Sequence, residues 1–208
     1  MGKRTVTVTG TGRANVAPDV VRLDLRVGHD APDVAAALSG ASAGITAVAA
    51  VVREQGVADA DLRTLDASVN QRWDNTGVAV GFTAQQRLAV TVRELAAVGR
   101  ILESAAAAIG NALLVDQVRL DISDRSLGLR EARDAAFTDA RSKADQYAAL
   151  SGASLGAVLG VAEGGAAPVG GGLKLAAMAR DMAGGMPVEG GDLELSASVT
   201  VTWELTRA

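Results

Sequence analysis

Residues able to do acid–base or nucleophilic chemistry are scarce in this sequence. The 208 residues include no cysteine and a single histidine, His29. Without cysteine there can be no disulfide, no thiolate metal site and no cysteine nucleophile. His29 follows a predicted strand and precedes Asp30, so we interpret it as a surface turn residue, and one histidine cannot form the usual zinc sites. We therefore expect no catalytic residue and no metal site.

Carboxylates are the remaining candidates for catalysis. Each group lies near a predicted element boundary, where aspartate commonly caps or turns the chain, and none has the spacing of a calcium-binding loop. Hydrolysis by paired carboxylates would need two groups to meet in a cleft. An unrecognised carboxylate-dependent hydrolase is therefore our least favoured alternative. The groups are Asp59, Asp61 and Asp66, then Asp121 and Asp124, and finally Asp192 and Glu194.

Two glycine-rich segments were compared with nucleotide-binding loops. Gly10-Thr11-Gly12 follows a predicted strand, but the dinucleotide fingerprint needs a third Gly or Ala at position 15, where Asn15 stands. The segment 170–174 lacks the Gly-Lys-Ser/Thr sequence of a phosphate-binding loop. We predict that Gly10-Thr11-Gly12 is a turn that breaks the first strand, and we expect no cofactor.

The elements that must position these residues follow from hydrophobic periodicity. Apolar and polar residues alternate from Leu193 to Thr206, which predicts a strand with one buried face and one polar face. Six further strands show similar alternation. Three helices have apolar residues spaced by three and four. Asp30, Pro32 and Asp33 form a plausible start for the first, and the third, about Ser126 to Leu150, carries a row of alanines. The order ββαββαβαβ predicts an α+β fold, a largely antiparallel amphipathic β-sheet of about seven strands with three helices packed on one face.

A hairpin is predicted between the third and fourth strands. The turn signal is Asp74-Asn75-Thr76-Gly77. If Trp73 lies opposite Val78, then Val69 lies opposite Phe82 and the apolar faces of the two strands coincide.

The polar sheet face is a candidate contact surface. Subunit packing, or the lining of an assembly's interior, would use such a face, and an ordinary solvated surface is the alternative. Its members are Thr5, Thr7, Thr9, Arg22, Arg26, Gln85, Arg87, Thr91, Ser196, Ser198, Thr200 and Thr202.

A Gly/Pro/Met-rich long loop is predicted at 164–191. Loops of this length are commonly functional or assembly elements. Met178, Met182 and Met186 are candidate oligomer contacts, because methionine suits adaptable surfaces, and a loop without such contacts is the alternative.

Charge and hydropathy restrict the partners and the location. The net charge is −4 with acids and bases interspersed, so we expect no nucleic acid partner. We also expect no membrane-spanning segment, since we see no apolar run close to the roughly 20 residues that a membrane helix needs. The first residues carry no apolar signal-peptide region. We expect a cytoplasmic location for the chain as written, or a periplasmic or exported one if a leader has been removed.

Three segments together resemble a known family, the SIMPL domain (DUF541). They are Thr5–Gly12 followed by Ala17-Pro18-Asp19, the segment from Glu131 to Ala144, and the tail Leu193–Val201. The resemblance covers essentially the whole chain in the right order and implies one SIMPL-like domain over 1–208. It further implies large homo-oligomers in bacterial proteins often exported to the envelope, with links to oxidative-stress tolerance and immunogenicity. It supplies no recognised catalytic residue.

We therefore expect a non-enzymatic, self-assembling protein that supports cell-envelope integrity or oxidative-stress tolerance. Its partner would be itself, through edge strands or the 164–191 loop, because an open sheet has edges that need pairing or protection. The alternative from another class is a small-ligand or lipid-binding module. It would use a cavity between the alanine-rich helices and the sheet.

Overall fold

The computed structural model describes residues 4–164 and 191–207. Within them it has seven strands and three α-helices in the predicted order, and this confirms the α+β prediction. Met178, Met182 and Met186 lie outside the described residues. The elements are β1 (Thr5–Val16), β2 (Val20–Ala31), α1 (Val34–Glu54), β3 (Leu62–Trp73), β4 (Ala79–Val92), α2 (Val98–Ile109), β5 (Leu113–Asp121), α3 (Ser126–Leu150), β6 (Ala153–Glu163) and β7 (Leu193–Arg207).

The strands form two antiparallel sheets, whereas the sequence predicted one. Sheet A has the order β1-β7-β6 and sheet B the order β3-β4-β2-β5. Alternation along a strand fixes which side chains share a face, but it does not say which strands pair, so it could not reveal the division. The described residues correspondingly split into two compact units, the first made of residues 4–17, 122–164 and 191–207 and the second of Pro18–Asp121. A single domain over 1–208 stays a prediction.

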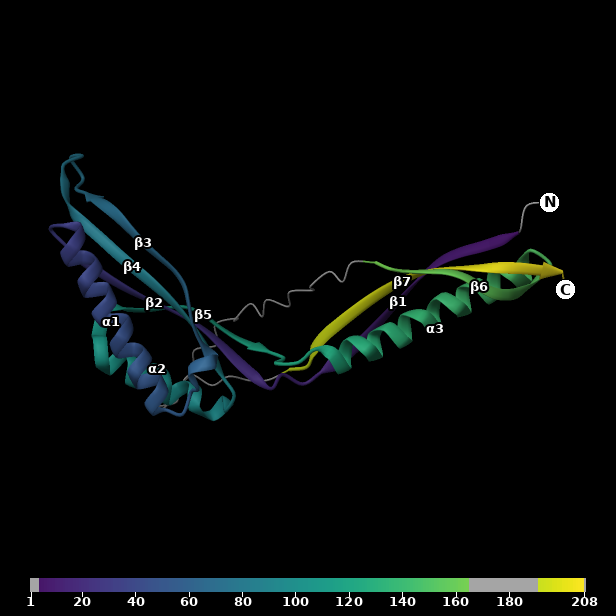
Figure 1. The fold of residues 1–208 in the computed structure, drawn as a ribbon, viewed down its shortest axis with the longest axis horizontal. Coiled ribbons are helices and arrows are strands. Elements are labelled where there is room, and N and C mark those ends of the chain that lie inside the picture. The colour runs from purple at the N-terminus through teal and green to yellow at the C-terminus, as the bar shows by residue number, and fades with distance from the viewer. Residues whose placement is uncertain (1–3, 165–190, 208) are drawn as a thin grey trace, which may run out of the picture. The chain divides into compact units, whose positions relative to one another are not determined.

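In the first unit, α3 lies along one face of sheet A (Figure 1). The predicted alanine row of α3 is fully buried against the sheet. A Cβ atom at Gly10 would overlap the carbonyl oxygen of Ala136 and come within 2.7 Å of the Ala140 Cβ, and Gly12 lies equally close to the helix. The predicted turn at Gly10-Thr11-Gly12 is therefore wrong. β1 runs through it without a break, and the glycines let helix and strand touch.

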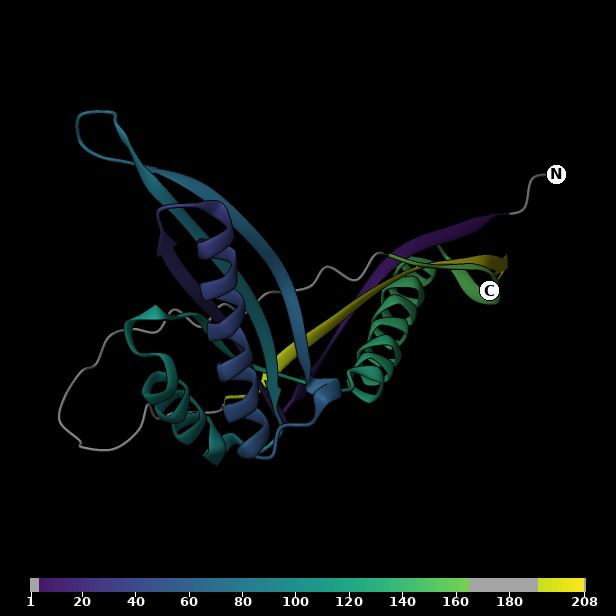
Figure 2. The same ribbon diagram turned by 60° about the vertical axis from the view of Figure 1, so that its left-hand side comes forward.

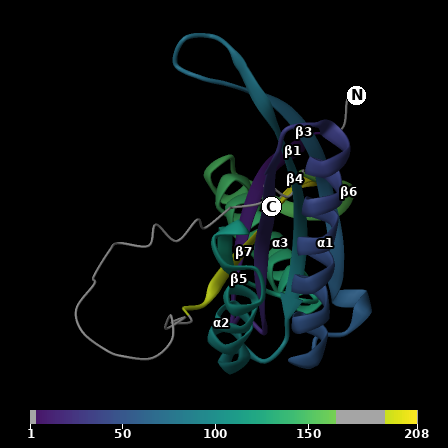
Figure 3. The same ribbon diagram turned by 90° about the vertical axis from the view of Figure 1, so that its left-hand side faces the viewer.

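In the second unit, α1 and α2 pack side by side on one face of sheet B (Figure 3). The core contains the inward residues of β2, which are Val21, Leu23, Leu25 and Val27, together with Val48 and Val52 of α1. The predicted start of α1 is confirmed, because the Asp33 carboxylate accepts a hydrogen bond of 2.9 Å from the Ala36 N–H.

Helix α1 is also long and apolar enough, by length and composition, to cross a membrane. The sequence analysis expected no apolar run of that length, yet the residues from Val34 to Val52 carry no charge. The buried side chains Ala37, Ala41, Val48 and Val52 pack one face of α1 on sheet B, while only 17% of its most apolar stretch is buried. The absence of a membrane-spanning segment stays a prediction.

The hairpin of β3 and β4 forms as predicted, but its register differs. Val69 lies opposite Ala84, two residues beyond Phe82, and Trp73 lies opposite Ala79. The shift of two residues at Val69 preserves its face, so Val69 and Phe82 still pack beside Ala84, whereas the shift of one residue at Trp73 does not preserve its face relative to Val78. The turn, which pairs Trp73 with Ala79, gives one residue of the shift, and the irregularity at Arg72/Trp73 gives the other.

Candidate association surfaces

The first candidate surface is the hairpin tip, residues 73–80. β2 ends at Ala31, opposite Phe82, so β3 and β4 continue beyond it as a two-stranded ribbon. Figure 2 shows this ribbon projecting past α1. Trp73 is 61% exposed, and Val78 and Val80, which flank its partner Ala79 on the neighbouring strand, are exposed as well. The sequence predicted that Trp73 and Val78 share an apolar face, but the pairing of Trp73 with Ala79 puts the two side chains on opposite faces of the ribbon.

The hairpin tip is held by its own hydrogen bonds. The Asp74 Oδ1 atom accepts from Thr76 N (2.8 Å), Thr76 Oγ1 (2.7 Å) and Val78 N (2.9 Å), while the Asp74 N–H donates to Val78 O (2.9 Å). The hydrogen bond from the Val78 N–H, followed by those from Thr76, lowers the pKa of Asp74 below its usual value. Gly77 supplies the positive φ of +81° that the turn requires. The apolar side chains are thus presented on a preformed turn.

The second candidate surface is β6, which forms one edge of sheet A. Its residues from Ala153 to Ala162 include no charge and no proline. Val158, Leu159 and Val161 are all exposed, with Val161 at 58%. The charge that ends the strand, Glu163, is held by Arg133 of α3 at 2.7 Å.

The opposite edge of sheet A, β1, is bonded by side chains from α3. The Leu205 N–H donates to Arg4 O. The backbone N–H and C=O groups of even-numbered residues of β1 therefore point toward β7, and those of odd-numbered residues point away from it. Of the outward groups, Thr11 N donates to Asp139 (2.8 Å) and Thr9 O accepts from Lys143 (3.1 Å). Lys143, and then the Thr11 N–H, lower the pKa of Asp139. Side chains of α3 therefore bond to the outward backbone groups of β1, which protects this edge against pairing with another strand.

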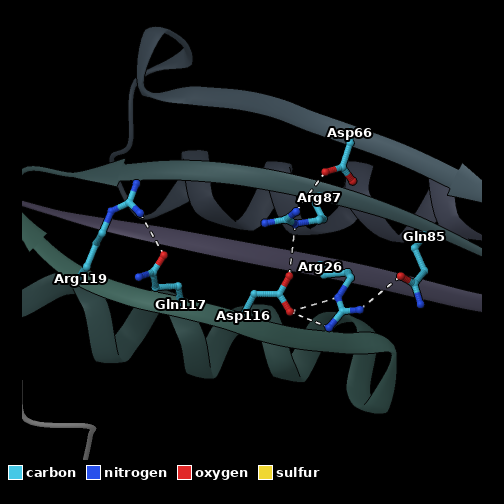
Figure 4. Close-up of polar contacts among 7 residues, drawn as sticks. All are labelled: Arg26, Asp66, Gln85, Arg87, Asp116, Gln117 and Arg119. Atoms are coloured by element: carbon cyan, nitrogen blue, oxygen red, sulfur yellow. Dashed lines mark hydrogen bonds and ion pairs between the residues drawn. The ribbon is translucent and has the colours of Figure 1, made fainter. Parts of the chain in front are cut away.

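The third candidate surface is the polar face of sheet B, called here the arginine face and defined by Arg22, Arg26, Arg87 and Arg119. Arg26 lies opposite Arg87, and Arg22 lies opposite Arg119. Like charges in these positions repel unless carboxylates intervene. Asp116 lies between Arg26 and Arg87, at 2.7 Å and 3.3 Å from their nitrogens (Figure 4).

The arginine face is balanced by further carboxylates. Asp66 accepts from Arg87 at 3.1 Å, and Asp121 pairs with Arg22. The contact of Arg87 Nε with Asp116 lacks hydrogen-bond alignment, so it is held by charge alone. These carboxylates link neighbouring strands of sheet B, and each already interacts with a cation.

The polar residues predicted to share one sheet face lie on two sheets. Those of β1 and β7 belong to sheet A, where hydroxyl pairs Thr7–Thr202 and Thr9–Thr200 meet at 2.9 Å. Arg22, Arg26, Gln85, Arg87 and Thr91 belong to sheet B.

A family model described as "SIMPL: Protein of unknown function (DUF541)" matches residues 6–203. The chain belongs to the SIMPL family. It is similar to the "26 kDa periplasmic immunogenic protein" of Brucella melitensis biotype 1 and to the protein of the same name in Brucella abortus strain S19. Both are 29% identical over 169 residues, which cover 76% of this chain and 66% of each relative.

In this SIMPL protein, the predicted carboxylate groups are engaged separately. Asp59 pairs with Arg53 at 2.6 Å and Asp61 with Arg93 at 2.9 Å. Asp124 accepts from the Ser126 N–H at 2.9 Å, and Glu194 pairs with Arg13 at 3.2 Å. Over the described ranges 4–164 and 191–207, no three His, Cys, Asp or Glu side chains are grouped so that they could hold a metal ion.

His29 lies within β2, not in the predicted turn, and it is exposed. A Cβ atom at Gly40 would overlap its ring, so the imidazole lies directly against α1. Gly40 thus explains how a large side chain fits against the helix.

Proposed function

We propose that this SIMPL protein acts by self-association and performs no catalysis. The observation that carries the proposal is the hairpin tip, where Trp73 and two valines are exposed on a turn fixed by Asp74. Grouped exposed apolar side chains mark interaction sites in soluble proteins, and tryptophan is enriched among the residues that dominate binding energy. A preformed turn also loses little conformational freedom on binding.

The carboxylate contacts support the non-enzymatic part of the proposal. A general base needs a carboxylate that can reach a substrate, yet Asp59, Asp61, Asp66 and Asp116 each interact with arginine. The arginine face is accordingly interpreted as a structural network across sheet B.

The location and role are proposed from the relatives. Two relatives are named as periplasmic, which favours a periplasmic location for this protein over the cytoplasmic one expected from the sequence. Within the envelope, we propose that the assembly supports envelope integrity or oxidative-stress tolerance.

The alternative of a small-ligand or lipid-binding module receives less support. It requires space between the alanine-rich helices and the sheets. At Gly10 and Gly12 the backbone of α3 lies against β1 so closely that not even a methyl group would fit. Small side chains here bring helix and strand together and do not open a cavity between them.

The absolute mass in solution tests the proposed function. We expect light scattering after size-exclusion chromatography to give a discrete mass that is a multiple of the 21.0 kDa chain. Trp73→Ser should lower the mass or shift assembly to higher protein concentration. Tyr147→Ser, which removes an aromatic side chain of similar exposure (55%) from α3, is the matched control and should change nothing. A monomeric wild-type protein at high concentration would refute self-association.

A further inference from the structure

We infer that β6 is the strand through which two copies of this chain pair, antiparallel and about a two-fold axis, so that two A sheets become one six-stranded sheet. The inference rests on the proposed self-association and adds the partner and the geometry of one contact.

β6 lacks the charged side chains and the side-chain hydrogen bonds found at the other edges. An open sheet edge pairs with other chains unless charges, covering groups or irregularities prevent it. β1 is bonded by Asp139 and Lys143 of α3. In sheet B, the edge β3 carries Arg63, Asp66 and Arg72, and the edge β5 carries Asp116 and Arg119. β6 has no charged side chain before Glu163.

The backbone of β6 also has groups that point outward. The Gly164 N–H donates to Ser198 O at 2.9 Å, so Gly164 faces β7. Since direction alternates along a strand, Ala162 also faces β7, while the N–H and C=O groups of Val161 and Glu163 point outward. Among the described residues, no side chain bonds to this outer edge as Asp139 and Lys143 bond to β1. A second extended strand supplies the donors and acceptors that such an edge needs.

The pairing partner of β6 is the β6 strand of another copy of this chain. A two-fold axis near Gly160 and Val161 brings the same uncharged segment from each copy together, so apolar side chains meet apolar ones and no charge is buried. The strand irregularities between Leu155 and Gly160 reach the axis itself, so the regular pairing that we infer is short and centred on Val161. A Cβ atom at Gly160 would meet nothing within 4 Å, so there is room beside the axis.

Single-cysteine cross-linking tests this geometry, because the natural sequence contains no cysteine. Cysteine is placed in turn at positions 159, 160, 161 and 162 of the full chain, and disulfide-linked dimer is measured after mild oxidation. Strand pairing predicts strong cross-linking at one position near the axis, since a disulfide needs Cα atoms about 4.4–6.8 Å apart, and weaker cross-linking at its neighbours. Thr7→Cys on the opposite edge strand is the control and should remain monomeric on a denaturing gel.

A second variant keeps the inference testable in the native state. Val161→Lys should halve the mass of the assembly, because it removes the two-fold contact. Val161 is exposed, so the lysine leaves the core intact, and circular dichroism should be unchanged. Val115→Lys on the edge strand β5 is the matched control and should keep the wild-type mass.

The outcomes separate this inference from the proposed function. An oligomeric wild type with no cross-linking at 159–162, and with an unchanged mass for Val161→Lys, would overturn β6 pairing and leave self-association intact. A monomeric wild type would overturn both. Cross-linking of equal strength at all four positions would indicate random collision and would also overturn the paired geometry.

Discussion

At the scale of single residues, two carboxylates satisfy backbone groups that the sheets leave unpaired. Asp74 accepts the N–H groups of the hairpin turn, and Asp139 accepts the outward N–H of β1. Hydrogen bonding stabilises the charged form, so the folded pKa of each lies below the ordinary value of 3.8. The stabilisation each gives is therefore complete above pH 3.8 and is lost as pH falls through the lower, folded pKa.

Titration of Asp74 tests the direction of its pKa shift directly. We expect the amide chemical shifts of Thr76 and Val78 to titrate together, with a midpoint below 3.8, in NMR spectra recorded from pH 7 to pH 2. Asp74→Asn should abolish that step while keeping an acceptor for the turn, and Asp74→Ala should lower the thermal midpoint at pH 7. A shared midpoint at or above 3.8 would show that the turn does not depend on the ionised carboxylate.

At the scale of elements, the sequence predicted most of the local structure. The bounds of α3, the cap at Asp33 and the β3–β4 turn follow from short-range chemistry and appear as expected. What it missed depends on partners far along the chain. The glycines of β1 looked like a turn because the helix that lies against them starts more than 100 residues later. Trp73 was expected on an apolar sheet face, but it lies in the part of the hairpin that continues beyond the end of β2.

The close approach of α3 to β1 predicts an unusual sensitivity to a single methyl group. Gly10→Ala would force helix and strand apart, and we expect it to lower the free energy of unfolding by about 1–3 kcal/mol or more. Gly160→Ala, in a strand of the same sheet but with open space around its Cβ, should be neutral or slightly stabilising. Urea denaturation measures both. Equal effects of the two substitutions would contradict the contact.

At the scale of the whole molecule, each hydrophobic core closes within one compact unit. The main cluster around Leu23 and Ile101 uses residues of the segment Pro18–Asp121, and the cluster around Trp203 uses α3 and sheet A. The segment 18–121 is continuous, and its ends adjoin, because the Asp19 N–H donates to Asp121 O at 3.1 Å. Such a segment has the form of a domain inserted into a chain, and its adjacent termini allow it to fold without the flanking strand and helix.

We therefore predict that residues 18–121 fold as a separate polypeptide. The fragment retains all of β2, α1, β3, β4, α2 and β5, so the buried residues of its core keep their partners. Its proton–nitrogen NMR spectrum should be dispersed, with slow amide exchange at Leu23, Leu25 and Val90, and its urea unfolding should be one cooperative step. A fragment of equal length, residues 1–104, is the control, because it lacks β5 and breaks α2, and it should give a collapsed spectrum. If the 18–121 fragment is as poorly dispersed as the control, the second unit depends on the rest of the chain, and the protein is a single cooperative domain.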